Sequence, residues 1–179
     1  MKKKLTVSLA VLALVACMAA GATLAWLTAK TSSVTNTFTY GDINIELKET
    51  TGESYKMVPG NTIAKDPKVT VKANSETCWL FVKVEKSDNF DDFMTYGIAD
   101  GWTKLDGENG VYYREVASST SDTEYGVLSG DSVTVKTTVT KEDFTGLTSE
   151  TMPTLTFTAY ACQKDNVDSA AEAWNLVNE

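Results

Sequence analysis

The side chains best suited to chemistry in this sequence are two cysteines and a group of aspartates, and no histidine accompanies them. Without an imidazole, neither a Ser-His-Asp nor a Cys-His catalytic set can form, and the usual hydrolytic zinc site loses its commonest ligand. The sequence also lacks a glycine-rich phosphate loop followed by lysine. We therefore expect a protein that is not an enzyme and that uses no cofactor.

The acidic group Asp88, Asp91 and Asp92 has two interpretations. Carboxylate oxygens are the ligands that calcium prefers, so the group could bind that ion. The alternative, which we favour, is a solvated turn that caps a short helix. The segment DGENG at 106–110 lacks the spaced third acid and the distal glutamate of a calcium loop, so we expect a hairpin turn there. We therefore assign no metal ligands.

Cys78 and Cys162 also have two interpretations. In an oxidising compartment they could form a disulfide, which would stabilise the fold by about 3–5 kcal/mol because the loop between them is long. The alternative is two buried free thiols. The sequence leaves both open, because the distance between the two Cα atoms is a property of the fold.

Several aromatic side chains could line a carbohydrate-binding surface, and we weigh that role against ordinary packing. We favour packing in the core and on the faces of a sheet for all of them. The residues are Trp79, Phe81, Trp102, Tyr112, Tyr113 and Trp174.

The N-terminal segment has the pattern of an export signal. Three lysines at positions 2–4 precede an apolar run over 5–27, and small residues cluster at its end. We predict a signal peptide over 1–25 that forms a helix, with cleavage after Ala25 so that Trp26 becomes the N-terminus. Two alternatives remain open: lipoprotein processing at Cys17, and an uncleaved membrane anchor. The prediction places the mature protein outside the cell, with membrane contact only through the signal before cleavage.

The charge balance excludes one class of partner. The formal net charge is −8, and cleavage after Ala25 lowers it to −11 because it removes three lysines and no acidic residue. Arg114 is the only arginine. Nucleic-acid binding needs clustered lysine and arginine, so we expect no nucleic-acid partner.

Residues 26–179 read as one domain of β-strands. Apolar and polar residues alternate in several segments, which is typical of half-buried strands. A run that is apolar on both faces, at 78–82, predicts a central strand. Short helices are predicted near 90–94 and after Ser169, where Glu172 completes a capping box. Strands separated by turns, without long alternating helices, favour an antiparallel β-sandwich with short peripheral helices. The alternating segments are 38–47, 69–73, 102–116, 131–140 and 154–162.

Glycine and proline mark the expected boundaries. The alternation changes phase across Gly41, from Phe38 and Tyr40 to the isoleucines that follow, so we expect a bulge or bend there. Pro59 and Gly60 predict a turn. Pro67 has no N–H to donate, so it should begin a strand or lie at an edge.

Long segments of the chain resemble TasA/camelysin-like proteins. The first is MKKKLTVSLAVLALVACMAAGATLAWLTAKTSSVTNTFTYGDINIELKE, and the others are VPGNTIAKDPKVTVKANSETCWLFVKVE, GWTKLDGENGVYYRE and LTFTAYACQKDNVDSAAEAWN. The resemblance implies a jelly-roll-like β-sandwich, cleavage by a SipW-type signal peptidase, and export to the surface of a Gram-positive cell. It further implies a subunit of biofilm matrix fibres. The metalloprotease label of camelysin relatives finds no support here, because the sequence has neither histidine nor an HExxH motif.

The same resemblance implies that residues 26–40 act as a donor strand for the next subunit. The segment is β-prone and carries one charge, on Lys30. Paired with a neighbour's sheet, such a segment satisfies its backbone groups and buries its aromatic side chains, and a head-to-tail contact of this kind propagates. The protein would then be its own partner. We expect assembly to depend on Trp26, Leu27, Phe38, Tyr40 and Gly41.

An alternative from another class is a monomeric surface adhesin that binds carbohydrate or protein through exposed aromatics such as Trp102 or Tyr112. A secreted protease ranks last.

Overall fold

The computed structural model describes residues 41–52 and 55–178, and these residues form a mostly β structure with three antiparallel sheets. The predicted residues Ala25, Trp26, Leu27, Phe38 and Tyr40, the signal segment and Cys17 lie outside the described part. The prediction of an all-β, antiparallel domain is confirmed for the part that is described.

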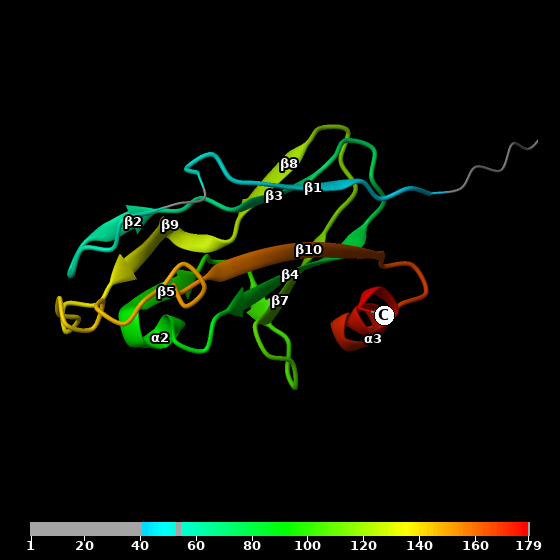
Figure 1. Ribbon diagram of the computed structural model, residues 1–179. Coiled ribbons are helices and arrows are strands. Elements are labelled where there is room, and N and C mark those ends of the chain that lie inside the picture. The colour runs from blue at the N-terminus through cyan, green and yellow to red at the C-terminus, as the bar shows by residue number, and fades with distance from the viewer. Residues whose placement is uncertain (1–40, 53–54, 179) are drawn as a thin grey trace, which may run out of the picture. The chain divides into compact units, whose positions relative to one another are not determined.

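The largest sheet has the order β10-β4-β7-β6 (Figure 1). Its central strand β4 (Cys78–Lys86) is the segment whose two apolar faces predicted a covered position. Hydrogen-bonded neighbours flank it on both sides, and alternate side chains are buried on each face. The other strands are β10 (Leu155–Gln163), β7 (Val111–Val116) and the short β6 (Thr103–Lys104).

A second sheet has the order β1-β3-β8, and a third has the order β2-β9-β5. The chain passes directly from one to the other twice, between β2 and β3 and between β8 and β9. Val127 lies at the second passage and donates its N–H to the carbonyl of Pro67, at 2.9 Å, which joins the two passages. The strands are β1 (Ile45–Lys48), β3 (Lys68–Val71), β8 (Thr123–Gly126), β2 (Thr62–Ala64), β9 (Leu128–Val135) and β5 (Met94–Ile98).

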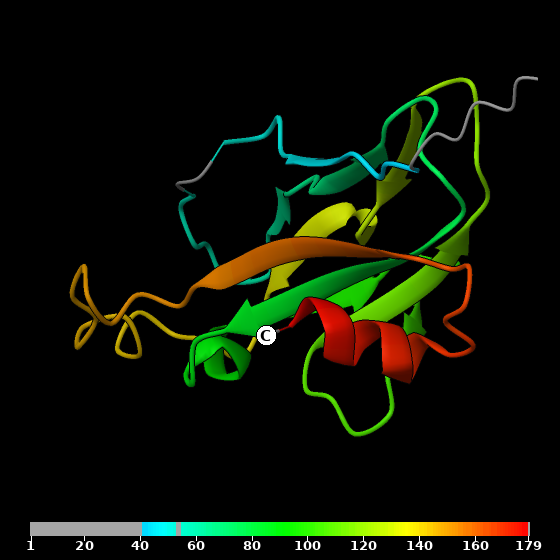
Figure 2. The same ribbon diagram turned by 90° about the vertical axis from the view of Figure 1, so that its right-hand side faces the viewer.

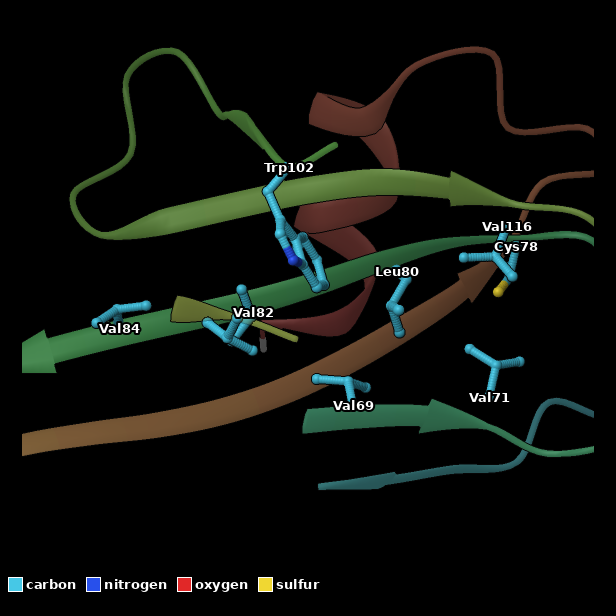
Figure 3. Close-up of a cluster of buried hydrophobic side chains, with 9 residues drawn as sticks. Val69, Val71, Cys78, Leu80, Val82, Val84, Trp102 and Val116 are labelled. Carbon is cyan, nitrogen blue, oxygen red and sulfur yellow. The ribbon is translucent and has the colours of Figure 1, made fainter. Parts of the chain in front are cut away.

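The main core lies between β3 and β4, which belong to different sheets (Figure 3). Val69 and Val71 of β3 meet Leu80 and Val82 of β4, and Trp102 enters the same cluster from the loop before β6. All five side chains are buried. Face-to-face packing of two sheets through alternate side chains explains the period-two pattern of these segments.

The opposite face of the largest sheet is covered by α3 (Ala170–Val177), as Figure 2 shows. Trp174 packs on Phe81, with ring centroids 5.4 Å apart, and edge-on against Tyr160, at 5.1 Å. The predicted helix cap is confirmed, because the Ser169 hydroxyl accepts a hydrogen bond from the N–H of Glu172. The second predicted helix is α2 (Phe90–Phe93), whose two phenylalanines are buried.

The turn predictions are also confirmed. Gly60 has a φ of +79° in the turn at Pro59, and β3 begins directly after Pro67. β6 and β7 pair as a hairpin around 106–110. One predicted strand is shorter than expected: β9 ends at Val135, and the buried Val139 follows in a turn.

Candidate assembly edge

The strand β10 has one hydrogen-bonded neighbour among the described residues, β4, and therefore one free edge. Two bonds just beyond its ends define which residues face that edge: Ser87 donates to the Thr154 carbonyl at 3.1 Å, and Lys164 donates to the Thr77 carbonyl at 3.0 Å. In an antiparallel pair, alternate residues direct both backbone groups to the same neighbour. The even-numbered residues of β10 therefore bond to β4. The free edge presents the N–H and C=O groups of Leu155, Phe157, Ala159, Ala161 and Gln163.

This edge lacks the features that usually protect a strand from pairing. β10 has nine residues, LTFTAYACQ, with no charge and no proline. Its register with β4 runs without a bulge from Leu155 opposite Lys86 to Gln163 opposite Cys78. Long, regular, uncharged edges of this kind readily add another strand.

The other sheet edges in residues 41–52 and 55–178 are better protected. β6 and β2 have two and three residues, and the register of β5 shifts between Tyr96 and Ile98. β1 carries Glu46 and Lys48, and β8 carries Glu124. Short length, bulges and charges all disfavour strand addition. β10 is therefore the edge best suited to it.

The side chains of β10 leave part of the main core open to solvent. Leu155, Phe157, Ala159 and Ala161 pack against that core but are only partly buried. Across from them, Ile43, Ile45 and Leu47 pack on the same core and are also partly buried. β1 and β10 lie beside each other (Figures 1 and 2), and no ladder joins them in the described structure. Cα atoms of the two strands approach within 8 Å, less than the roughly 9.6 Å that a strand paired between them needs, so a strand that adds to β10 must displace β1. It would then bury apolar surface, at about 25 cal/mol per Å².

A polar loop fixes the end of β1 next to β10. The carboxylate of Asp66 accepts hydrogen bonds from the N–H groups of Thr50 and Thr51, at 2.9 and 3.0 Å, and from the Thr50 hydroxyl at 2.6 Å. Those bonds, led by the Thr50 hydroxyl, hold the pKa of Asp66 well below its ordinary value of 3.8. Lys65 pairs with Glu49, with Nζ 2.9 Å from Oε1, and lies near the rings of Tyr55 and Phe157. Sequence reasoning gave no role to this anchor, although buried Lys and Asp before a strand are unusual.

A pocket of about 510 Å³ opens at the start of β10. Most of its lining is apolar and comes from β2, β5, β9 and the segment before β10, and Lys65 supplies the one charged side chain. The volume is in the range that accepts a bulky group. Its apolar lining includes Met57, Ile63, Met94, Val133 and Leu155.

Gly41 is the one predicted assembly residue within the described part. A Cβ atom there would lie 2.7 Å from Cγ of Glu76, so glycine permits a close approach between this segment and the turn before β4. The neighbouring N–H of Glu76 donates to the Asp42 carbonyl at 3.0 Å. Ile43 and Ile45 pack against the main core, as the alternation after Gly41 predicted. The strand expected before Gly41 lies outside the described residues.

Cys78 and Cys162 are both buried free thiols, which is the second of the two predicted alternatives. Cys78 lies in the main core, and Cys162 lies on the α3 side of the same sheet. The predicted alternative of a disulfide is therefore wrong, because the side chains point away from each other across the sheet. Burial raises the pKa of Cys78 to about 11 and also raises the pKa of Cys162, so both remain protonated at neutral pH.

The acidic residues lie at the surface as favoured, but the prediction that their turn caps α2 is wrong, because its N-cap residue is Asn89 and no side chain there forms a capping hydrogen bond. Asp91 forms an ion pair with Lys86, and Asp88 and Asp92 lie at the surface. Within the described ranges, no group of three or more cysteine and acidic side chains is arranged to hold a metal ion. The 106–110 segment closes the β6–β7 hairpin, with Gly107 and Gly110 at positive φ.

Most of the aromatic side chains pack in the core or on a sheet face, which is the role that the sequence favoured over carbohydrate binding. Trp102 is 9% exposed, and its Nε1 donates to the Gly126 carbonyl at 2.8 Å, so its assignment as an exposed adhesin residue is wrong. Tyr112 is partly buried and packs on the main core. The alternating pattern around Trp102 fits a buried side chain as well as an exposed one. A half-buried strand and an exposed binding face both show this alternation, so the pattern does not distinguish the two roles.

No helix in the described ranges is both long and apolar enough to span a bilayer. Comparison of the chain with family models, curated proteins and solved structures gives no match.

Proposed function

We propose that the protein is a secreted structural subunit that assembles into extracellular or biofilm matrix fibres by strand exchange between copies. In this proposal residues 1–25 are a signal peptide removed by a SipW-type peptidase, and residues 26–179 form a jelly-roll-like β-sandwich. The function is non-enzymatic, and the localisation is the matrix or the cell surface. The resemblance of the sequence to TasA/camelysin-like proteins supports this proposal.

One structural observation carries the proposal: the free edge of β10. It offers the backbone groups of five alternate residues over a strand with no charge, proline or bulge. The side chains of those residues belong to a core that is only partly covered on this side. An incoming strand would supply both the missing backbone partners and the missing cover.

The segment at 26–40 is suited to occupy that edge. Extended chain rises about 3.3 Å per residue, so the segment spans roughly 50 Å, against roughly 30 Å for the nine residues of β10. It therefore has length to pair along β10 and to link two copies. Its single charge, on Lys30, matches the uncharged acceptor strand. The pocket at the start of β10 could receive one of its aromatic side chains.

The proposal is tested by comparing a chain that begins at Trp26 with one that begins at Gly41, by electron microscopy and light scattering. We expect fibres from the first and monomers from the second, which keeps every described element. A synthetic peptide of residues 26–40 should bind the shorter chain and slow fibre growth by the longer one, whereas a scrambled peptide should not. Equal fibre formation by both chains contradicts the donor-strand role. A longer chain that stays monomeric at high concentration favours the adhesin alternative.

A further inference from the structure

Arg114 occupies an unusual position between two sheets. It lies on β7 opposite Leu80 of β4, so its side chain leaves the sheet on the face of the main core. There its guanidinium carbon is 4.0 Å from the ring centroid of Tyr125 on β8 and 5.4 Å from that of Trp102. Cation–π contact of this kind favours a fixed place for the guanidinium plane over the ring faces.

The guanidinium has no polar partner within residues 41–52 and 55–178. Its Nε is buried and donates no hydrogen bond, and all seven ion pairs in this part of the chain use lysine. Glu115, the next residue along β7, points to the opposite face and pairs with Lys164. The unpaired Nε carries an unfavourable desolvation cost, and because it is closed to solvent, the two Nη groups are the donors that a ligand or water can reach.

The surrounding chain is shaped to hold this side chain. Gly101 has a φ of +86°, which favours glycine, and its backbone lies close to the guanidinium: a Cβ there would be 2.9 Å from Nη2 of Arg114 and would displace it. The indole of Trp102 is held by its bond to the Gly126 carbonyl, the residue after Tyr125. The two aromatic rings thus limit the positions of the guanidinium before any ligand arrives, and such preorganisation reduces the entropy lost on binding.

We propose that Arg114 is a binding site for a carboxylate. The planar guanidinium fork matches a carboxylate in a bidentate arrangement. The net charge of −8, or −11 after the proposed cleavage, repels all anions, but it repels a singly charged carboxylate less than phosphate or another polyanion. The carboxylate is carried either by a small molecule such as a sugar acid or by an acidic side chain of a second copy. The site is independent of the proposed strand exchange, because β4 separates β7 from β10 in the sheet.

The unique arginine provides its own test. In a proton–nitrogen correlation spectrum of isotope-labelled protein, the single arginine Nε–H signal belongs to Arg114. Glucuronate and acetate are titrated separately, with sodium sulfate as the dianion control, at constant ionic strength. We expect saturable shifts of this signal with the carboxylates and a non-saturating response to sulfate. A shift that grows with protein concentration alone identifies a carboxylate of a second copy. No saturable shift under any of these conditions, or tighter binding of sulfate, overturns the proposal.

Variants test whether the fork itself recognises the ligand. Arg114→Lys keeps the charge but loses the planar fork, and we expect binding at least about tenfold weaker. The indole N–H signal of Trp102 reports binding in this variant, which lacks arginine. Lys141→Gln, which removes an exposed positive charge after β9, is the matched control and should bind as the parent does. Equal affinity in Arg114→Lys overturns recognition by the fork, and the titration of the unaltered protein decides the proposal if that variant fails to fold.

Discussion

Cys78 and Cys162 lie on neighbouring strands, one register step apart, and their side chains enter opposite faces of one sheet. Cys162 is opposite Trp79, and Cys78 is opposite Gln163. Because side chains alternate along a strand, a one-step offset is enough to prevent a disulfide between adjacent strands. We expect both thiols to resist alkylation in the native protein and to react after unfolding, as mass spectrometry can show. A cross-linked mass that disappears on reduction would contradict this.

The buried thiol of Cys78 should make the fold sensitive to alkali. Its pKa rises from 9.0 to about 11 on folding, because burial disfavours the thiolate. The unfolded chain therefore ionises first as the pH rises, and the free energy of unfolding should fall between pH 9 and pH 11. Urea unfolding across this range measures the fall. Cys78→Ala should flatten it, although the smaller side chain lowers stability at every pH; an unchanged slope would rule out Cys78 as the cause.

Asp66 should make the fold sensitive to acid. Its pKa is lowered on folding by the hydrogen bonds from Thr50 and Thr51, so its contribution is present above its ordinary pKa of 3.8 and is lost as the pH falls below that value. Asp66→Asn should be less stable than the parent at neutral pH. The difference between the two should shrink in acid, as thermal unfolding at several pH values can show. A difference that is independent of pH would mean that the carboxylate charge is unimportant.

Two glycines of one hairpin should respond differently to the same substitution. Gly107 has a φ of +83°, and a Cβ there would have no heavy atom within 4 Å, so Gly107→Ala should cost only the backbone strain, about 1 kcal/mol. Gly110 has a φ of +71°, and a Cβ there would lie 2.2 Å from the Val84 carbonyl oxygen. Gly110→Ala should therefore cost more than about 2 kcal/mol in chemical denaturation. Equal losses of stability in the two variants would contradict the close contact between Gly110 and the Val84 carbonyl of β4.

The free edge of β10 can be blocked without touching its bonded edge. The N–H of Ala159 faces outward, so Ala159→Pro should spare the ladder with β4 and reduce fibre growth by at least about tenfold. The N–H of Thr158 bonds to β4, so Thr158→Pro should instead lower thermal stability sharply. Fibre growth followed by light scattering, together with the melting temperature, separates the two effects. Undiminished fibre growth in a folded Ala159→Pro variant would place assembly at another edge.

Local features of this protein follow from the sequence because short-range physics decides them. Alternation predicted β10, a run that is apolar on both faces predicted the covered strand β4, and the cap of α3 follows from Ser169 and Glu172. The turn at Gly60 follows from the tolerance of glycine for positive φ. The segment at 26–40 is also identified from its composition, and its role remains a prediction.

Only the tertiary structure decided which segments meet. Alternation assigns a side chain to one of two faces, but it does not say which strand lies alongside, because pairing joins residues far apart in the chain. The free edge of β10, the separation of Cys78 from Cys162 and the unpaired Nε of Arg114 among the described residues all depend on that pairing. Trp102 shows the difference: the sequence favoured its packing, but only the structure shows that it packs among residues of β3 and β4, neither of which adjoins it in sequence.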